Sequence, residues 1–171
     1  MINTLSCRLS QALLAVFTAL LFASPPSQGA DETEESLTNG YATAFWNSFN
    51  NDLAAGELET YLAHWDENAE RITPTLHARG IDAIRATYKS YLAAYGDFHQ
   101  TELRRLVDGN VVVSELLTRA RDKKTGAVLS LPNVAILEFN DRGKVSRARV
   151  YLDTGKFNPE GPALSQDGTA K

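Results

Sequence analysis

The sequence has almost no cysteine and little histidine. Its one cysteine, Cys7, lies in an N-terminal segment that we expect to be removed, and its three histidines are scattered without the spacing of metal ligands. These scarcities argue against a disulfide framework, a thiolate or zinc site and a cysteine nucleophile. We therefore expect no metal and no cofactor, and a domain held together by its hydrophobic core alone.

The sequence also lacks an excess of positive charge and a long hydrophobic run. Lys and Arg number 17 against 21 Asp and Glu, so the net charge is −4, which argues against nucleic acid or an anionic membrane as a partner. The apolar stretch at 12–23 is shorter than the ~20 residues of a membrane-spanning helix. Because Arg8 precedes it and small residues follow, residues 1–30 are predicted to be a signal peptide rather than a membrane anchor. The mature protein would then be exported, to the periplasm or beyond the cell.

The first half of the mature chain has helical patterning. Residues 31–36 form an acidic leader, either a linker or the first turn of a helix. Apolar residues then recur at helical spacing from Leu37 to Leu53, and Gly56 ends the pattern. A short helix is predicted at 57–65, a strand at 70–73, and a longer helix that Asp82 caps and Gly96 closes.

The second half reads as four strands, at 98–107, 111–121, 130–139 and 144–153. The segments between them, "DGN", "DKKTG" and "NDRG", are typical of hairpin turns, so we predict an antiparallel meander. Helices gathered on one face of a curved antiparallel sheet give an α+β fold, with a cavity between the sheet and the helices. Residues 158–171 are predicted to be a flexible tail.

Three segments in this order resemble one family: "AAGELETYLAHWDENAERITP", "RGIDAIRATY" and "EFNDRGKVSRARVYLDTGKF". The chain from residue 37 to residue 157 resembles the SnoaL-like group of the nuclear transport factor two-like superfamily. The resemblance implies a cone-shaped α+β barrel, often dimeric, with a deep pocket. The superfamily includes ketosteroid isomerases, limonene epoxide hydrolases, polyketide cyclases and members without a known reaction, so the fold alone does not define an activity.

The catalytic groups of the ketosteroid isomerases are not matched. Their base, tyrosine and neutral acid fall at Thr73, Phe49 and Ala135 of this sequence. A threonine hydroxyl is too weak a base to take a proton from carbon, and neither Phe nor Ala donates a side-chain hydrogen bond. The Arg and two Asp of the epoxide hydrolases are also missing, because their positions fall at Leu116, Thr118 and Val150.

Strand alternation predicts which residues face the pocket, because successive side chains point to opposite faces of a sheet. The face that holds Asn133, Ala135 and Val150 is neutral and largely apolar, whereas the charged residues of the last strands lie on the other face. With the aromatic face of the helices, this gives a predicted ligand-binding set of Trp46, Phe49, Thr73, Tyr88, Leu116, Thr118, Asn133, Ala135 and Val150. His77, in the loop after Thr73, is the remaining acid/base candidate, and the alternative is an exposed loop histidine.

Three functions are compatible with these residues. The one we favour is the binding of a small hydrophobic or amphipathic molecule without turnover, since aromatic walls with a few polar groups suit such a ligand. The second is an isomerase, cyclase or hydrolase that uses His77 with Tyr88 or Asp153. The third is an accessory protein that forms a homodimer through its sheet and has a vestigial pocket.

Overall fold

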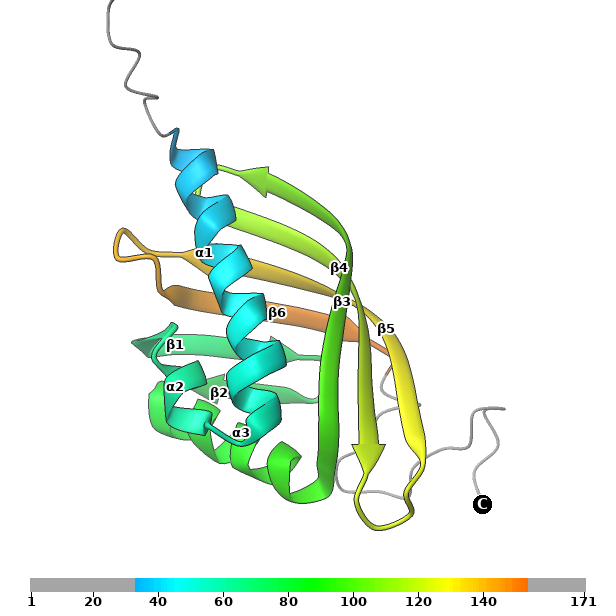
Figure 1. The fold of residues 1–171 in the computed structure, drawn as a ribbon. Coiled ribbons are helices and arrows are strands. Elements are labelled where there is room, and N and C mark those ends of the chain that lie inside the picture. The colour runs from blue at the N-terminus through cyan, green and yellow to red at the C-terminus, as the bar shows by residue number, and fades with distance from the viewer. Residues whose placement is uncertain (1–32, 154–171) are drawn as a thin grey trace, which may run out of the picture. The chain divides into compact units, whose positions relative to one another are not determined.

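The computed structural model describes residues 33–153, which form helices packed on a curved sheet (Figure 1). The helical elements are α1 (Glu34–Ser48), the π-helical turn η1 (Phe49–Leu53) that continues it, α2 (Leu58–Leu62) and α3 (Ile81–Ala94). The strands are β1 (Trp65–Thr73), β2 (Leu76–Arg79), β3 (Tyr95–Asp108), β4 (Val111–Asp122), β5 (Val128–Phe139) and β6 (Val145–Leu152). The predicted signal peptide and tail lie outside the described residues. Within 33–153, no helix is both long enough and apolar enough to cross a membrane.

The six strands form one sheet in the order β2-β1-β6-β5-β4-β3. Strands β3 to β6 form the predicted antiparallel meander, and β2 pairs with β1 as a short antiparallel hairpin. Strand β1 runs parallel to β6, so the sheet is mixed and not wholly antiparallel as predicted. The α+β class is confirmed. The parallel pair joins β1, which follows the N-terminal helices, to the last strand of the meander.

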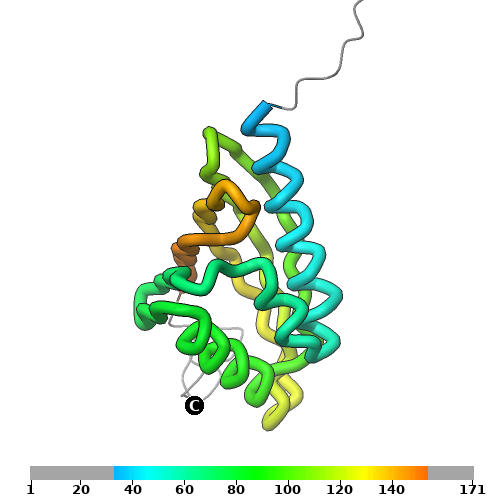
Figure 2. The backbone as a smooth tube through the Cα atoms, turned by 90° about the vertical axis from the view of Figure 1, so that its left-hand side faces the viewer, coloured from blue at the N-terminus to red at the C-terminus, as the bar shows by residue number. Residues whose placement is uncertain are grey.

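All three α-helices cover one face of the sheet. Helix α1 packs against β3, β4 and β5, whereas α3 packs against β1 and β2 (Figure 2). The strand register places Arg71, Ala148, Leu137 and Val112 in one row across this covered face. Because side chains alternate between faces, residues two positions away along each strand also point towards the helices.

Helix α1 begins earlier than its apolar pattern. The side chain of Thr33 caps the helix, its Oγ1 accepting a hydrogen bond from the backbone N–H of Ser36 at 3.2 Å. Glu34 and Glu35 then occupy the first turn, where negative charge is favoured by the helix dipole. The end of the acidic leader is therefore the first turn of the helix.

Several predicted boundaries are wrong around β1 and α3. Strand β1 begins at Trp65 rather than at residue 70, and His77 lies on strand β2 rather than in a loop. Helix α3 begins after Gly80, whose positive φ of 76° turns the chain into the helix without a side-chain cap. Asp82 does not cap the helix, because its carboxylate pairs with Arg85 in the next turn. The helix ends at Ala94, before Gly96.

Candidate functional site

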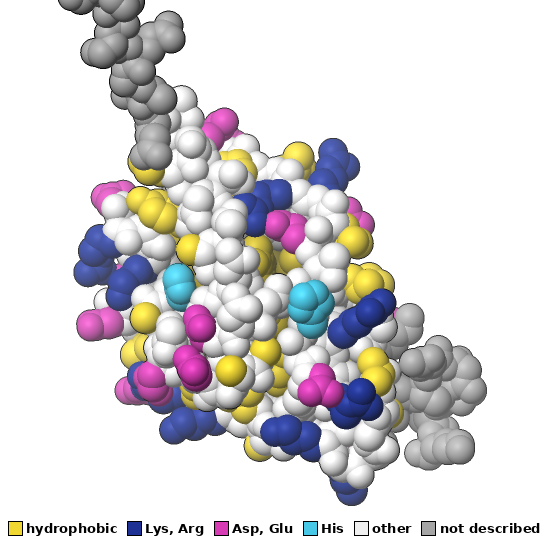
Figure 3. Space-filling view, viewed as in Figure 1, with side chains coloured by type: hydrophobic (Ala, Val, Ile, Leu, Met, Phe, Trp, Pro, Cys, Tyr) yellow, Lys and Arg dark blue, Asp and Glu magenta, His cyan; other side chains and the backbone are white. Residues whose placement is uncertain are grey.

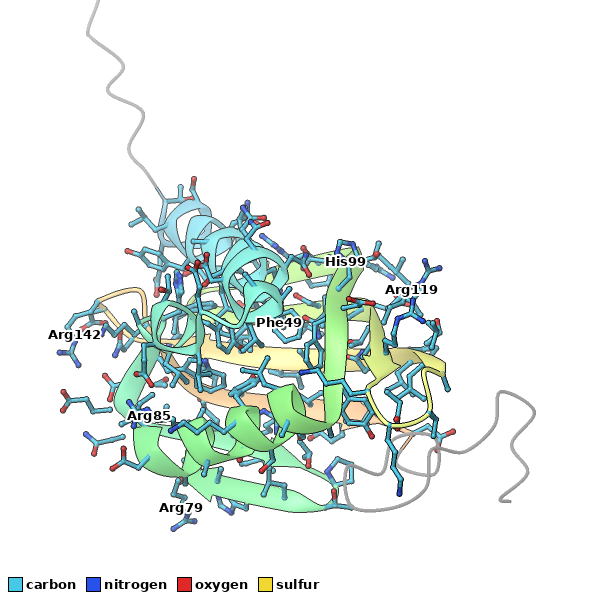
Figure 4. The ribbon with its side chains drawn as sticks, turned by 60° about the horizontal axis from the view of Figure 1, so that its bottom comes forward. Phe49, Arg79, Arg85, His99, Arg119 and Arg142 are labelled. Carbon is cyan, nitrogen blue, oxygen red and sulfur yellow. The ribbon has the colours of Figure 1, made fainter. Side chains whose placement is uncertain are left out.

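A cavity with a volume of about 80 Å³ lies between the helices and the sheet. Its helical side is aromatic, and Figure 4 shows Phe49 pointing between the helical layer and the strands. The aromatic residues that line the cavity are Phe45, Trp46, Phe49, Tyr61, Trp65, Tyr88, Tyr91 and Phe98. Their rings pack against one another, as Phe49 and Tyr61 do at 82° with centroids 5.8 Å apart. This edge-to-face packing gives the cavity a rigid, largely apolar wall.

Local sequence explains why these rings converge. Phe45 and Phe49 are four residues apart, so they share one side of α1 where it passes into the π-helical turn. The polar side of that turn faces the sheet edge, because the Asn50 side chain donates to the backbone C=O of Gln100 at 2.9 Å and accepts from its N–H at 2.7 Å. These two bonds hold the end of α1 against β3 and keep Phe49 in the cavity wall.

The structure brings most of the predicted ligand-binding residues together. Seven of the nine line the cavity: Trp46, Phe49, Tyr88, Thr118, Asn133, Ala135 and Val150. Two do not. Leu116 is buried in the core at 1 % exposure, and Thr73 lies at the end of β1, where its hydroxyl accepts from the N–H of Thr75. Ligand binding by the seven stays a prediction.

His77 lies away from the cavity. Its register with Ile72 places its side chain on the opposite face of the β1–β2 hairpin from Arg71 and Ala78. There the side chain is exposed, with Nε2 3.5 Å from a Glu70 carboxylate oxygen and accepting a hydrogen bond from Arg79. The imidazole therefore contacts an outer charged cluster and not the cavity residues.

Arg71 is a lining residue that the predicted set does not contain. It comes from β1, is only 7 % exposed, and its guanidinium carbon lies 5.4 Å from the ring centroids of both Tyr88 and Tyr91. Within residues 33–153 no carboxylate forms an ion pair with it, and its Nη1 has no hydrogen-bond partner. Burial lowers the pKa of Arg71, but the nearby hydroxyls of Tyr88 and Tyr91 raise it by more. The cavity therefore contains a permanent, incompletely satisfied cation.

Two tyrosine hydroxyls lie on the same side of the cavity as Arg71. The hydroxyls of Tyr61 and Tyr88 are 2.9 Å apart and buried, and their rings pack edge to face. Burial raises the pKa of Tyr61 well above its usual value, and the neighbouring Tyr88 adds to this effect. Tyr61 thus stays a neutral phenol, so it donates or accepts a hydrogen bond but does not act as a base near neutral pH.

A second polar group of side chains lies farther along the sheet. Gln100 and Asn133 both donate through their amide nitrogens to the Thr118 hydroxyl, at 3.0 and 2.7 Å. This leaves the amide oxygens Oε1 of Gln100 and Oδ1 of Asn133 buried and without a hydrogen-bond partner in the described chain. The cavity thus has donors near Arg71 and two free acceptors near Thr118.

No Asp, Glu or His of the described chain lines this cavity. A reaction that begins with proton removal from carbon, or that activates water, needs a group that accepts a proton near neutral pH. The residues that replace the expected catalytic groups at the wall, Phe49, Ala135 and Val150, do not supply one. Within residues 33–153 there is also no cluster of three His, Cys, Asp or Glu that could hold a metal ion.

The predicted set omits Arg71 because it takes its strand residues from β4, β5 and β6 and only Thr73 from β1. Arg71 and Thr73 share parity along β1, so the assignment of Thr73 to the pocket also indicates Arg71. The same alternation that placed Ala135 and Val150 correctly would have placed Arg71 inside. The neutral face predicted for the last strands is therefore joined in the cavity by one cation from β1.

Comparisons with known proteins agree with this geometry. Residues 43–148 match the family model described as the SnoaL-like domain. An LEH-like epoxide hydrolase from M. tuberculosis has 18% sequence identity and a TM-score of 0.60, covering 71% of this chain and 86% of its own. A candidate SnoaL-like polyketide cyclase from Jannaschia sp. CCS1 has 14% identity and a TM-score of 0.62, covering 70% and 88%.

A third structure is a hypothetical protein of ketosteroid isomerase-like fold from Catenulispora acidiphila DSM 44928, solved in complex with trimethylamine. It has 12% identity and a TM-score of 0.56, covering 65% of this chain and 83% of its own. At these identities the likeness is one of fold. Among curated proteins, none matches this chain in sequence.

Proposed function

Because this chain belongs to the SnoaL-like domain family, whose fold usually binds small molecules, we propose that it binds a small hydrophobic or amphipathic molecule in the cavity between α1, α3 and the sheet. We further propose that it does so without ketosteroid isomerase or epoxide hydrolase activity. The observation that carries this proposal is the composition of the wall, which is aromatic and aliphatic and has no carboxylate or imidazole among the described residues.

The size of the cavity limits the ligand. A cavity of roughly 150 Å³ lined by apolar side chains accommodates benzene, whereas this one has about 80 Å³. The ligand is therefore smaller than benzene, or a half-buried wall residue such as Tyr91 or Leu152 moves when it binds. A cavity of this volume is too small for a steroid in the observed side-chain arrangement.

A thermal-shift screen of the full chain tests the proposal, with small hydrocarbons, alcohols, amides and acids as the compounds. A true ligand raises Tm in proportion to the logarithm of its concentration, and at 100 times Kd it adds about 2.7 kcal/mol of stability. Ala135→Leu, which adds three carbon atoms to a lining residue, should remove this shift. Ala83→Leu, at an exposed position of α3, is the matched control and should keep it.

Two results would contradict the proposal. One is that no compound shifts the Tm of the wild-type chain. The other is that every compound shifts Ala135→Leu as strongly as the wild-type chain, which would place binding outside the cavity. Isomerisation of a ketosteroid or hydrolysis of an epoxide by the chain would refute the second half of the proposal.

We also propose that the protein is exported and cleaved near residue 30. The support is the short apolar stretch at 12–23, followed by small residues. Intact-mass analysis of the protein expressed in a bacterial host tests this. Loss of the first 30 or so residues from the processed form is expected, and recovery of only the uncleaved chain from the membrane fraction would contradict it.

A further inference from the structure

Arg71 differs from the other arginines of the described chain in what surrounds it. Seven of them pair with a carboxylate within 4.0 Å, namely Arg79, Arg85, Arg105, Arg121, Arg142, Arg147 and Arg149. The remaining two, Arg104 and Arg119, are exposed to solvent. Arg71 has no carboxylate partner, yet at 7% exposure it is the one charged residue among the buried side chains of residues 33–153. A buried charge is normally paired, because the protein interior replaces the hydration shell poorly.

Contacts within the protein compensate Arg71 only in part. The faces of Tyr88 and Tyr91 provide cation–π contacts on its guanidinium. The N–H groups of a guanidinium lie in its plane, so a ring face does not accept hydrogen bonds from them as an oxygen atom would. The Nη1 of Arg71 is left without an acceptor in the described chain. Tyr61, whose pKa burial raises, stays neutral and supplies no counter-charge. The missing partner is therefore an anionic oxygen.

We infer that the ligand of this cavity is a small monocarboxylate, whose carboxylate binds Arg71 and whose short apolar body contacts Phe49, Ala135 and Ala148. This inference rests on the proposed function and adds the chemical class of the ligand. A planar carboxylate matches the fork of a guanidinium. A single negative charge is matched by the one cation of the lining, whereas a doubly charged phosphate would leave excess charge in an apolar cavity.

The test compares compounds of one shape and different charge on the full chain by isothermal titration calorimetry. Isobutyrate is the acid, isobutyramide is its neutral counterpart and trimethylammonium is a cation of similar size. We expect isobutyrate to bind roughly 10- to 100-fold more tightly than isobutyramide, and trimethylammonium not to bind. This contrast is measured on the wild-type chain and does not depend on the folding of a variant.

Two variants then assign the selectivity to Arg71. Arg71→Met keeps a side chain of similar length without the charge and should bind isobutyrate no better than isobutyramide. Arg79→Met makes the same change of charge at an outer position of β2, where the side chain is 72% exposed and projects away from the fold (Figure 4). Arg79→Met should keep the full selectivity of the wild type.

The outcomes separate this inference from the proposed function. If isobutyramide and isobutyrate bind equally well, the cavity still takes a small molecule but the inference is wrong. Retained selectivity in Arg71→Met would also overturn it, by placing the anion site elsewhere. If none of the compounds binds and the wider screen also fails, the proposed function falls with it.

Discussion

Arg71 lies against two aromatic rings, and its own Nη1 has no hydrogen-bond partner in the described chain. The cost of burying its charge can be compared with the stabilisation that the rings provide. Burying an ion costs several kcal/mol after relaxation, even in a real protein interior. Each cation–π contact returns about 0.5–2 kcal/mol. The burial cost exceeds what two cation–π contacts return, so Arg71 lowers the stability of the protein when no ligand is bound. Such a cost is typical of a binding site, where the ligand restores what the empty site lacks.

The unliganded stability of Arg71→Met should therefore be equal to or greater than that of the wild type, by about 1 kcal/mol. Methionine fills similar space between Tyr88 and Tyr91 and carries no charge to desolvate. Urea unfolding monitored by circular dichroism measures the difference. Tyr88→Phe is the comparison. It leaves the buried Tyr61 hydroxyl without its 2.9 Å partner and should cost about 1–2 kcal/mol. A loss of several kcal/mol in Arg71→Met would mark Arg71 as a structural residue.

His64 should make stability depend on pH. Burial lowers its pKa, Asp52 opposes this and Lys144 adds to it, so the folded state holds the imidazole neutral to lower pH than the unfolded chain does. The unfolded chain then binds more protons as the pH falls through about 6.5, and stability decreases. His64→Gln should flatten the dependence of Tm between pH 7.5 and 5.5. His99→Gln, at an exposed site on β3, is the control; equal slopes in His64→Gln and wild type would contradict the assignment.

Secondary-structure elements could be predicted where the local sequence decides them. The three turns of the meander carry their own Gly, Asn and Asp signals, so β3 to β6 were found together with the faces that Ala135 and Val150 occupy. Strand β1 is predicted only in part, because "WDENAER" is polar and its partner strand β6 lies far away in the sequence. Strand β2 has only four residues, and this is too short for its alternation of Leu76 and Ala78 with polar residues to indicate a strand. Tertiary pairing, and not local preference, makes both of them strands.

The lining of the cavity could also be predicted only where the local sequence decides it. Trp46, Phe49, Ala135 and Val150 could be predicted, because core-facing residues recur with the period of the helix or strand and the family resemblance places a pocket beside them. Phe45, Tyr61 and Phe98 also line the cavity and were not predicted. The environment of Arg71 could not be predicted, because it depends on α3 packing over β1 and bringing Tyr88 and Tyr91 to the guanidinium. A sequence shows that an arginine is present, but not that its carboxylate partner is missing.

Glycines at two helices give a matched pair of predictions. Gly80 precedes α3 with φ of 76°, a conformation that L-residues adopt at a cost, so Gly80→Ala should destabilise the domain by about 1–2 kcal/mol. Gly40 lies inside α1 with open space around it, so Gly40→Ala should stabilise by about 0.5–1 kcal/mol. Chemical denaturation measures both changes. Opposite signs are expected, and a stabilising Gly80→Ala would show that the start of α3 is not strained.

The two faces of the sheet have different surroundings. The inner face is covered by the helices, whereas the outer face of β3 to β6 is hollowed and carries Leu106, Val113, Val134 and Tyr151 among Arg104 and Glu115. On the helical side, acidic and basic side chains are interspersed over the surface (Figure 3). The exposed apolar side chains around this hollow make the outer face a candidate for contact between two copies of the chain.

A homodimer should therefore form through the outer face of the sheet. Leu106 and Tyr151 are 53% and 55% exposed, and burying large apolar side chains of this kind favours association. Size-exclusion chromatography with light scattering should give twice the mass of the processed chain. Leu106→Glu places a charge at the expected contact and should weaken association at least about tenfold, because a buried unpaired charge costs more than 1.4 kcal/mol.

Leu37→Glu is the control for this change, because Leu37 is 39% exposed on α1, on the opposite side of the sheet. It should leave the dimer intact. The ligand cavity lies between the helices and the inner face, so its wall needs no residue from a second copy. Leu106→Glu should consequently keep the binding of small molecules while it lowers the mass to that of one chain. Loss of binding together with dimer dissociation would show instead that the second copy holds the helices over the cavity.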